Sequence, residues 1–140
     1  MMNNAATFKE SCLSIMGNLL EGFQFKYHDA RARPRGVEVE FRRNEDAVLL
    51  ACEGNVLHAD LILKRRESSW LRISINQALW FQNKRALVNS DGCLEQVNTL
   101  CAELKSLDTN FLGGNLSELD PRFCFPMSDA EYKIYRGAEK

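Results

Sequence analysis

The sequence lacks the local patterns by which enzymes, membrane proteins and multidomain proteins are usually recognised. No apolar run approaches the roughly 18 residues of a membrane-spanning helix, and residues 1–4 lack the basic start and apolar stretch of a signal peptide. There are only three prolines, and no low-complexity stretch or internal repeat occurs. The glycine pair Gly113–Gly114 follows a predicted helix, whereas a phosphate-binding loop precedes one. We therefore expect a single domain over residues 1–140, with no membrane segment.

Cysteine number and spacing favour free thiols. The number is odd, and no CxxC pair occurs among Cys12, Cys52, Cys93, Cys101 and Cys124. Four of them lie on apolar stripes or beside apolar residues, as reduced core cysteines do in cytoplasmic proteins. Zinc needs three or four ligands at characteristic spacing, which neither the cysteines nor the two histidines offer. We expect reduced structural cysteines, a cytoplasmic protein, and neither a metal nor a cofactor.

Residues 36–76 show the two-residue period of β-strands. In residues 36–43 the apolar Val37, Val39 and Phe41 alternate with charged residues. Residues 48–52 form a continuous apolar run, typical of a central strand covered on both faces. Segments 57–64 and 71–76 alternate again after short polar turns. Connections this short join antiparallel neighbours, because a parallel crossover needs about a dozen residues or more. A further strand at residues 23–27 is expected to pair at one edge.

Two amphipathic helices flank this block. Residues 7–21 begin with a Thr7–Glu10 capping box. One apolar stripe at helical spacing runs along this segment and continues to residue 23: Phe8, Cys12, Ile15, Met16, Leu19, Leu20 and Phe23. Residues 93–107 carry a second stripe: Leu94, Val97, Leu100, Cys101, Leu104 and Leu107. A third, short helix is expected to begin at Ser128, with Glu131 three residues on. The predicted fold class is therefore α+β: an antiparallel β-meander of four to five strands with the N-terminal and late helices packed on one face.

Few residues offer catalytic chemistry. His58 and Asp60 lie two residues apart on one strand, so their side chains share a face. This pair could be a general base with an orienting carboxylate, but a polar pair on a solvated sheet face is the simpler interpretation. His28 lies near a strand end beside a basic segment, where a loop histidine is the simpler interpretation. A Cys–His nucleophile pair stays open, because such partners meet in space rather than in sequence.

Charge is unevenly distributed along the chain. Residues 1–90 carry a balance of +3 and residues 91–140 a balance of −4. Between residues 91 and 120, six acids face only one basic residue, Lys105. They form either a solvated helix face or an acidic surface for a basic protein partner. Alternating Arg31, Arg33 and Arg35, predicted in a loop, could touch phosphates, but a nearly neutral chain without interleaved aromatics disfavours nucleic-acid binding.

Aromatic residues cluster around the last predicted strand. Trp70, Trp80 and Phe81 flank it, and such residues either cap the core or anchor a protein interface, where Trp is enriched. Together with the acidic residues they form the predicted partner-binding set: Trp70, Trp80, Glu95, Glu103, Asp108, Glu118 and Asp120. If the partner is a nuclease, its phosphate-binding cleft is basic, and an acidic surface would imitate the charge of its substrate.

The layout and two short segments resemble the small cytoplasmic immunity proteins of bacterial polymorphic or contact-dependent toxin systems. The first helix ends in Leu20-Glu21-Gly22-Phe23, and the late helix runs into residues 107–115. The step at 111–115 resembles a helix followed by Leu-Gly-Asp in several α+β families, although Asn115 stands where an acid is common. The resemblance implies stoichiometric neutralisation of a cognate toxin domain by occlusion, and it carries over no catalytic residue.

Two other classes compete with this prediction. Chaperones of type III secretion effectors are similar in size and layout, but they tend to be more acidic than this chain, whose pI is near 6.1. A small enzyme without a recognisable motif is the third class. A non-enzymatic binding protein is our expectation, with its partner a toxin rather than a nucleic acid or a membrane.

Overall fold

An antiparallel sheet organises the chain. The computed structural model describes residues 5–34, 36–54, 56–66, 69–75, 77–78, 92–106, 110–113 and 121–136. Within them six strands follow one another in the order β1-β2-β3-β4-β5-β6, and each pairs with the next along the chain. Their bounds are β1 Lys26–Arg33, β2 Gly36–Arg43, β3 Asp46–Glu53, β4 Val56–Arg66, β5 Ser69–Ser74 and β6 Cys124–Ser128. The predicted meander of residues 37–75 is confirmed as β2 to β5.

Alternation along the strands sorts side chains between the two sheet faces. Val39 pairs with Leu50, and Leu50 with Ala59, so these apolar residues form one row across β2, β3 and β4. All three are fully buried. The intervening residues of β2, including Glu38 and Glu40, face the other way because successive side chains alternate. Alternation therefore predicted correctly which residues of β2 enter the main core.

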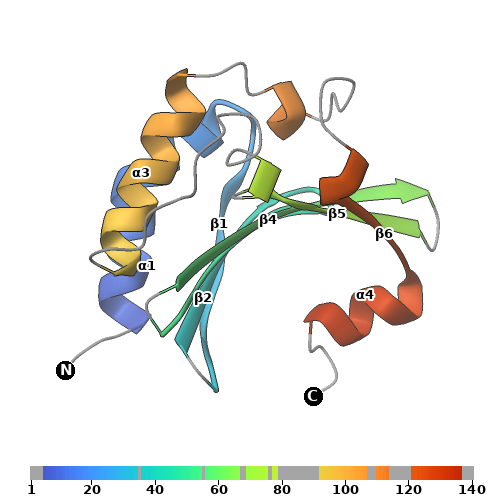
Figure 1. Cartoon of the computed structure of the whole chain (residues 1–140), viewed down its shortest axis with the longest axis horizontal. Helices are drawn as coiled ribbons and strands as arrows, with labels where there is room; N and C mark the ends of the chain where they lie inside the picture. The colour runs from blue at the N-terminus through green and yellow to red at the C-terminus, as the bar shows by residue number, and fades with distance from the viewer. Residues whose placement is uncertain are drawn as a thin grey trace.

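Two long helices cover the apolar face, as the sequence predicts. They are α1 (Ala5–Glu21) and α3 (Cys93–Ser106), and they pack side by side on the sheet (Figure 1). Their buried stripes meet the sheet in one core that includes Met16, Leu20, Phe41, Leu61 and Leu100. None of the described helices is long and apolar enough to cross a membrane.

The first strand differs from its prediction. It runs over Lys26–Arg33 rather than residues 23–27, so Arg31 and Arg33 lie on an edge strand and not in a loop. Arg31 pairs directly with Glu38 across the ladder, and opposite charges at such positions stabilise the pairing. Residues 22–24 form the turn that precedes β1, with Gln24 at a positive φ of 76°.

The sheet also has one strand more than the four to five predicted. The additional strand, β6, pairs with β5 and leads directly into α4 (Asp129–Arg136). The short helix predicted at Ser128 is confirmed, because Ser128 caps it. Ser128 Oγ accepts a hydrogen bond from Glu131 N at 3.2 Å, and Glu131 Oε1 accepts one from Ser128 N at 2.8 Å. Unlike α1 and α3, α4 lies against the other face of the sheet (Figure 1).

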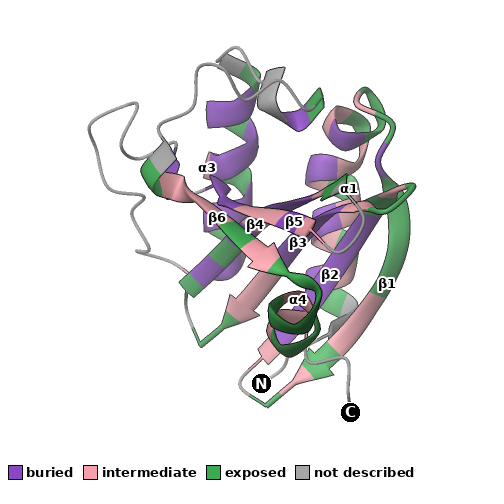
Figure 2. Cartoon of the chain, turned by 90° about the vertical axis from the view of Figure 1, so that its right-hand side faces the viewer, coloured by how far each residue is buried: buried purple, intermediate pink, exposed green. Residues whose placement is uncertain are grey.

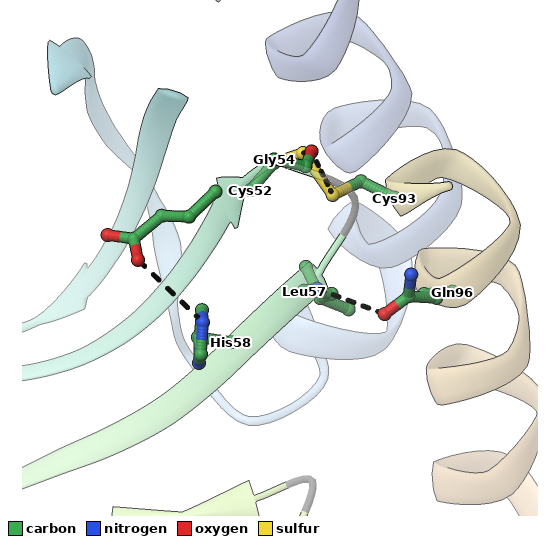
Figure 3. Close-up of a disulfide and its surroundings, with 7 residues drawn as sticks. Cys52, Gly54, Leu57, His58, Cys93 and Gln96 are labelled. Carbon is green, nitrogen blue, oxygen red and sulfur yellow. Dashed lines mark hydrogen bonds and ion pairs between the residues drawn. A yellow bond between two sulfur atoms is a disulfide. The ribbon is translucent and has the colours of Figure 1, made fainter. Parts of the chain in front are cut away.

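The prediction that all five cysteines are free is wrong. Cys52, near the end of β3, forms a disulfide with Cys93, the first residue of α3, across a Cα–Cα distance of 5.9 Å (Figure 3). Cys12, Cys101 and Cys124 keep their thiols, and burial raises the pKa of the Cys12 thiol to about 12. Disulfides are typical of oxidising compartments. The cytoplasmic assignment therefore stays a prediction and loses the support that free thiols gave it.

Candidate functional site

The sheet face opposite α1 and α3, here called the second face, is covered only in part. A small apolar cluster of Ala47, Leu49, Ile62 and Trp70 lies on it, and α4 packs against this cluster. Trp70 stacks on Tyr132 of α4 with ring centroids 3.7 Å apart and planes 3° from parallel. Trp70 Nε1 also donates a hydrogen bond to Asp129 Oδ1 at 3.0 Å. No residue of α4 is itself buried, and Figure 2 shows the helix standing over the sheet with its outer side in solvent.

A buried carboxylate anchors the end of α4 to the sheet. The Glu40 side chain on β2 has no exposed surface and forms ion pairs with three arginines: Arg31 at 2.7 Å, Arg42 at 2.6 Å and Arg136 at 2.7 Å. Burial alone would raise the pKa of Glu40, but hydrogen bonds from Arg31 and Arg42 and the positive charge of Arg136 lower it to about 2. Glu40 is therefore ionised at neutral pH, although it is fully enclosed.

Glu38 extends this network along β2. It is 7% exposed, and its Oε1 accepts hydrogen bonds from Arg31 Nη1 at 2.8 Å and from Arg33 Nε at 3.0 Å. We call the four guanidinium groups held by Glu38 and Glu40 the arginine cluster: Arg31, Arg33, Arg42 and Arg136. Arg31 also reaches the exposed Asp29 at 3.3 Å. Two strands and one helix thus meet at a set of cations fixed by carboxylates beneath them.

A second polar contact joins α4 to β4. Tyr135 OH donates a hydrogen bond to Asp60 Oδ2 at 2.5 Å, and Arg72 Nη1 lies 3.4 Å from both Asp60 oxygens. Burial and the neighbouring Asp60 charge raise the pKa of the Tyr135 hydroxyl, so this group is protonated at neutral pH. The Arg72 guanidinium lies over the Phe125 ring, 4.7 Å from its centroid. Both Asp60 oxygens therefore have partners within the chain.

An open groove lies beside these contacts. Its volume is about 490 Å³, and its lining includes the side chains of Arg33, Glu38, Glu53, His58, Asp60, Arg72 and Tyr135. The groove is polar and carries both signs of charge, which favours a polar or charged occupant over an apolar one. The walls come from β1, β2, β3, β4, β5 and α4, so residues far apart in sequence converge there.

His58 and Asp60 do share this face, as predicted, but they have different partners. His58 is exposed, and its Nε2 lies 3.8 Å from Glu53 Oε1. Asp60 binds Tyr135 and Arg72 instead. In this arrangement Asp60 does not orient the His58 imidazole. His28 is exposed on β1, at the bulge between Tyr27 and Asp29.

The described members of the predicted partner-binding set do not form one surface. Trp70 is 7% exposed and belongs to the apolar cluster under α4. On α3, Glu95 is exposed but Glu103 is buried at 6% exposure. The remaining four residues, Trp80, Asp108, Glu118 and Asp120, lie outside the described residues. Trp70 and Glu103 are thus buried on opposite sides of the sheet, and α3 lies on the face away from the groove.

The arginine cluster was missed by sequence reasoning. Its signal was the alternation of Glu38, Glu40 and Arg42 on the polar side of β2. That signal becomes a site only when Arg31 and Arg33 are placed on the neighbouring strand. Arg136 lies more than ninety residues after Glu40 in the sequence, and no local sequence pattern predicts their contact. Within the described residues, no group of three or more His, Cys, Asp or Glu side chains could hold a metal ion.

Comparison with known proteins adds no assignment. The chain matches no protein-family model, and neither a curated protein nor a solved structure is significantly similar to it.

Proposed function

We propose that this chain is a binding protein that neutralises a bacterial toxin domain by stoichiometric occlusion, and that the second face is its contact surface. The observation that carries the proposal is the fixed array of charged side chains around an open groove. Glu38 and Asp60 line the groove, and Glu40 is linked to Glu38 through Arg31. Each of the three carboxylates is held by two or more hydrogen bonds from within the chain. Such an array is preorganised, so little binding free energy is lost in ordering its side chains when a partner binds.

The two edge strands of the described sheet are poorly suited to pairing with a partner, which favours contact through the second face. β1 is interrupted by the bulge at His28 and carries charged side chains, and β6 has only five residues with Pro126 among them. Bulges, charges and proline are the features by which edge strands avoid pairing with another chain. A partner that adds a strand to the described sheet is therefore disfavoured. The groove on the second face is the better candidate.

The first test asks whether the chain acts as a stoichiometric inhibitor. The partner is captured from the source cell and identified, and its toxic activity is then titrated with purified chain. Occlusion predicts that inhibition is complete at one molar equivalent and reverses when the complex is separated. Full inactivation by a small fraction of an equivalent would indicate an enzyme. A partner without toxic activity that is destined for export would indicate a chaperone.

The second test asks which surface the partner contacts. His58→Trp places a large ring at the exposed wall of the groove and is expected to weaken binding by tenfold or more, about 1.4 kcal/mol. Glu95→Trp makes a comparable change at an exposed site of α3 and serves as the matched control. Weakening by Glu95→Trp alone would place the interface on the acidic helix, as the charge distribution of the sequence predicts.

A further inference from the structure

We infer that the arginine cluster receives an acidic segment of the protein partner, an inference that rests on the second face being the binding surface. This reverses the sign of charge expected from the sequence, where an acidic surface was matched to a basic toxin. Four observations carry it: the excess of hydrogen-bond donors, the difference in exposure between the two signs of charge, the open position of Arg42, and an unpaired nitrogen of Arg136.

The cluster holds more donors than its carboxylates can accept. Four guanidinium groups present about twenty N–H donors, whereas Glu38 and Glu40 offer about eight lone-pair sites. Tyr132 OH, the Arg136 carbonyl oxygen and the Asp29 carboxylate accept some of the remaining donors, and the exposed parts of Arg31, Arg33 and Arg42 leave others open to water. A partner that carries carboxylates supplies the acceptors in the planar, bidentate geometry that guanidinium groups prefer.

Burial separates the two charges on this face. The carboxylates of Glu38 and Glu40 lie beneath the surface, with side chains 9% and 0% exposed, whereas those of Arg31 and Arg33 are 28% and 26% exposed. A partner approaching the cluster therefore meets guanidinium groups, with the exposed Asp29 carboxylate beside Arg31, before it meets Glu38 or Glu40. Because each guanidinium is already anchored from below, little side-chain freedom is lost when its outer nitrogens bind.

Arg42 is the most accessible member of the cluster. Its side chain is 44% exposed, and its Nε is held by Glu40 Oε2 at 2.6 Å. That contact uses one nitrogen, and Nη1 and Nη2 make no hydrogen bond among the described residues. We expect Arg42 to make the first contact with a partner carboxylate.

Arg136 shows independently that the cluster has too few hydrogen-bond acceptors. Its side chain is 9% exposed, its two terminal nitrogens bind Tyr132 and Glu40, and its Nε finds no acceptor among the described residues. Buried polar nitrogens without partners are rare in folded proteins. The shortage of acceptors within the chain therefore extends to the buried Nε of Arg136.

An acidic protein segment fits better than a nucleic acid. The exposed carboxylates of Asp29 and Glu53 lie at Arg31 and at the groove rim. A continuous phosphate backbone would be repelled by them, whereas a protein segment can place its acids selectively. Nucleic-acid sites also draw on long basic stripes, and this chain has a net charge of −1.

The test uses the full chain labelled with nitrogen-15 and three probes of equal length at low ionic strength: an oligoglutamate peptide, an oligolysine peptide and a single-stranded oligothymidine. Oligoglutamate is expected to shift the amide and guanidinium signals of Arg31 and Arg42, and added salt should reverse the shifts. Shifts of the same signals by oligolysine, or equally tight binding of oligothymidine there, would overturn the inference. So would the absence of any shift with oligoglutamate.

Substitutions sharpen the test. Arg42→Gln keeps a donor towards Glu40 and removes the charge, and it is expected to weaken oligoglutamate binding by roughly tenfold. Arg42→Lys keeps the charge without the planar fork and should restore part of that loss. Arg65→Gln removes one exposed charge in the β4–β5 hairpin as the matched control and should change affinity less than about twofold. Equal effects of Arg42→Gln and Arg65→Gln would contradict a defined site.

The outcome separates this inference from the proposed function. If oligoglutamate does not bind but His58→Trp still disrupts the partner complex, the acidic segment is refuted and the second face stands as the binding surface. If His58→Trp has no effect on the complex either, both are refuted.

Discussion

Removing the Cys52–Cys93 disulfide is expected to lower the free energy of unfolding by several kcal/mol. The bond spans a sequence separation of 41 residues, and the chain-entropy model assigns about 4 kcal/mol at 25 °C to closing a loop of this size in the unfolded state. Enthalpic terms differ between proteins, so a measured loss of about 2–4 kcal/mol is the expected range. Much of this effect arises in the unfolded chain rather than from interactions within the folded one.

The fold itself should survive the removal. Next to the bond, Gln96 Oε1 of α3 accepts a hydrogen bond from Leu57 N of β4 at 2.9 Å, which still ties the helix to the sheet (Figure 3). Further along, Cys101 Sγ lies 3.3 Å from the Ile15 carbonyl oxygen of α1. The double variant Cys52→Ala/Cys93→Ala is therefore expected to keep a native circular-dichroism spectrum while it unfolds at lower urea concentration.

The assay compares urea unfolding of the oxidised chain, the same chain with a thiol reductant, and the double alanine variant. The last two should agree, and both should show a larger m-value because their unfolded state exposes more surface. Cys124→Ala removes a half-buried cysteine outside the disulfide and is the control. Titration of the denatured, unreduced chain should find three reactive thiols. Five thiols, together with a stability that does not change with reductant, would refute the disulfide.

Three further changes test the packing and the charge network. Glu40 has a folded pKa of about 2 against an ordinary 4.5. The ionised Glu40 therefore adds about 3 kcal/mol to the free energy of unfolding above pH 4.5, and this contribution is lost as the pH falls towards 2. In urea unfolding, the free energy of unfolding should fall more steeply with decreasing pH for the wild type than for Glu40→Gln. Leu61 is fully buried in the core, and Leu61→Ala should lower the free energy of unfolding by about 2–5 kcal/mol. Val56 is 42% exposed, and Val56→Ala should change it by no more than about 0.5 kcal/mol. Equal losses would mean that the two sheet faces are misassigned. Tyr132→Ala removes the ring stacked on Trp70 and should make α4 sensitive to protease while the sheet stays intact, and unchanged digestion would show that the stack does not hold the helix.

Local periodicity accounts for the parts of the fold that were predicted. Val37, Val39 and Phe41 alternate with charged residues over a long enough run to determine both the strand and its inward face. β1 was misplaced because Arg31 and Arg33 alternate with alanines, which have low strand propensity. Their position is set by ion pairs with β2. β6 contains Pro126 and acquires its strand conformation from pairing with β5, so it has little signal of its own.

The candidate site was harder to predict because charge counts do not report burial. Glu103 contributes to an acidic segment in the sequence, yet on α3 it lies seven residues after Gln96, and both are buried on the same side of the helix. The disulfide was missed for a related reason. It joins the end of β3 to the start of α3, and a sequence separation of 41 residues does not predict that these two ends lie close together in the fold.

The central claim, that the partner binds the second face through the arginine cluster, is tested most directly by labelling arginines with a dicarbonyl reagent in the free chain and in the complex. The account predicts that Arg42 and Arg31 lose most of their reactivity in the complex, while the exposed Arg65 reacts at an unchanged rate. Unchanged reactivity of Arg42 in a complex that protects residues of α3 would contradict it.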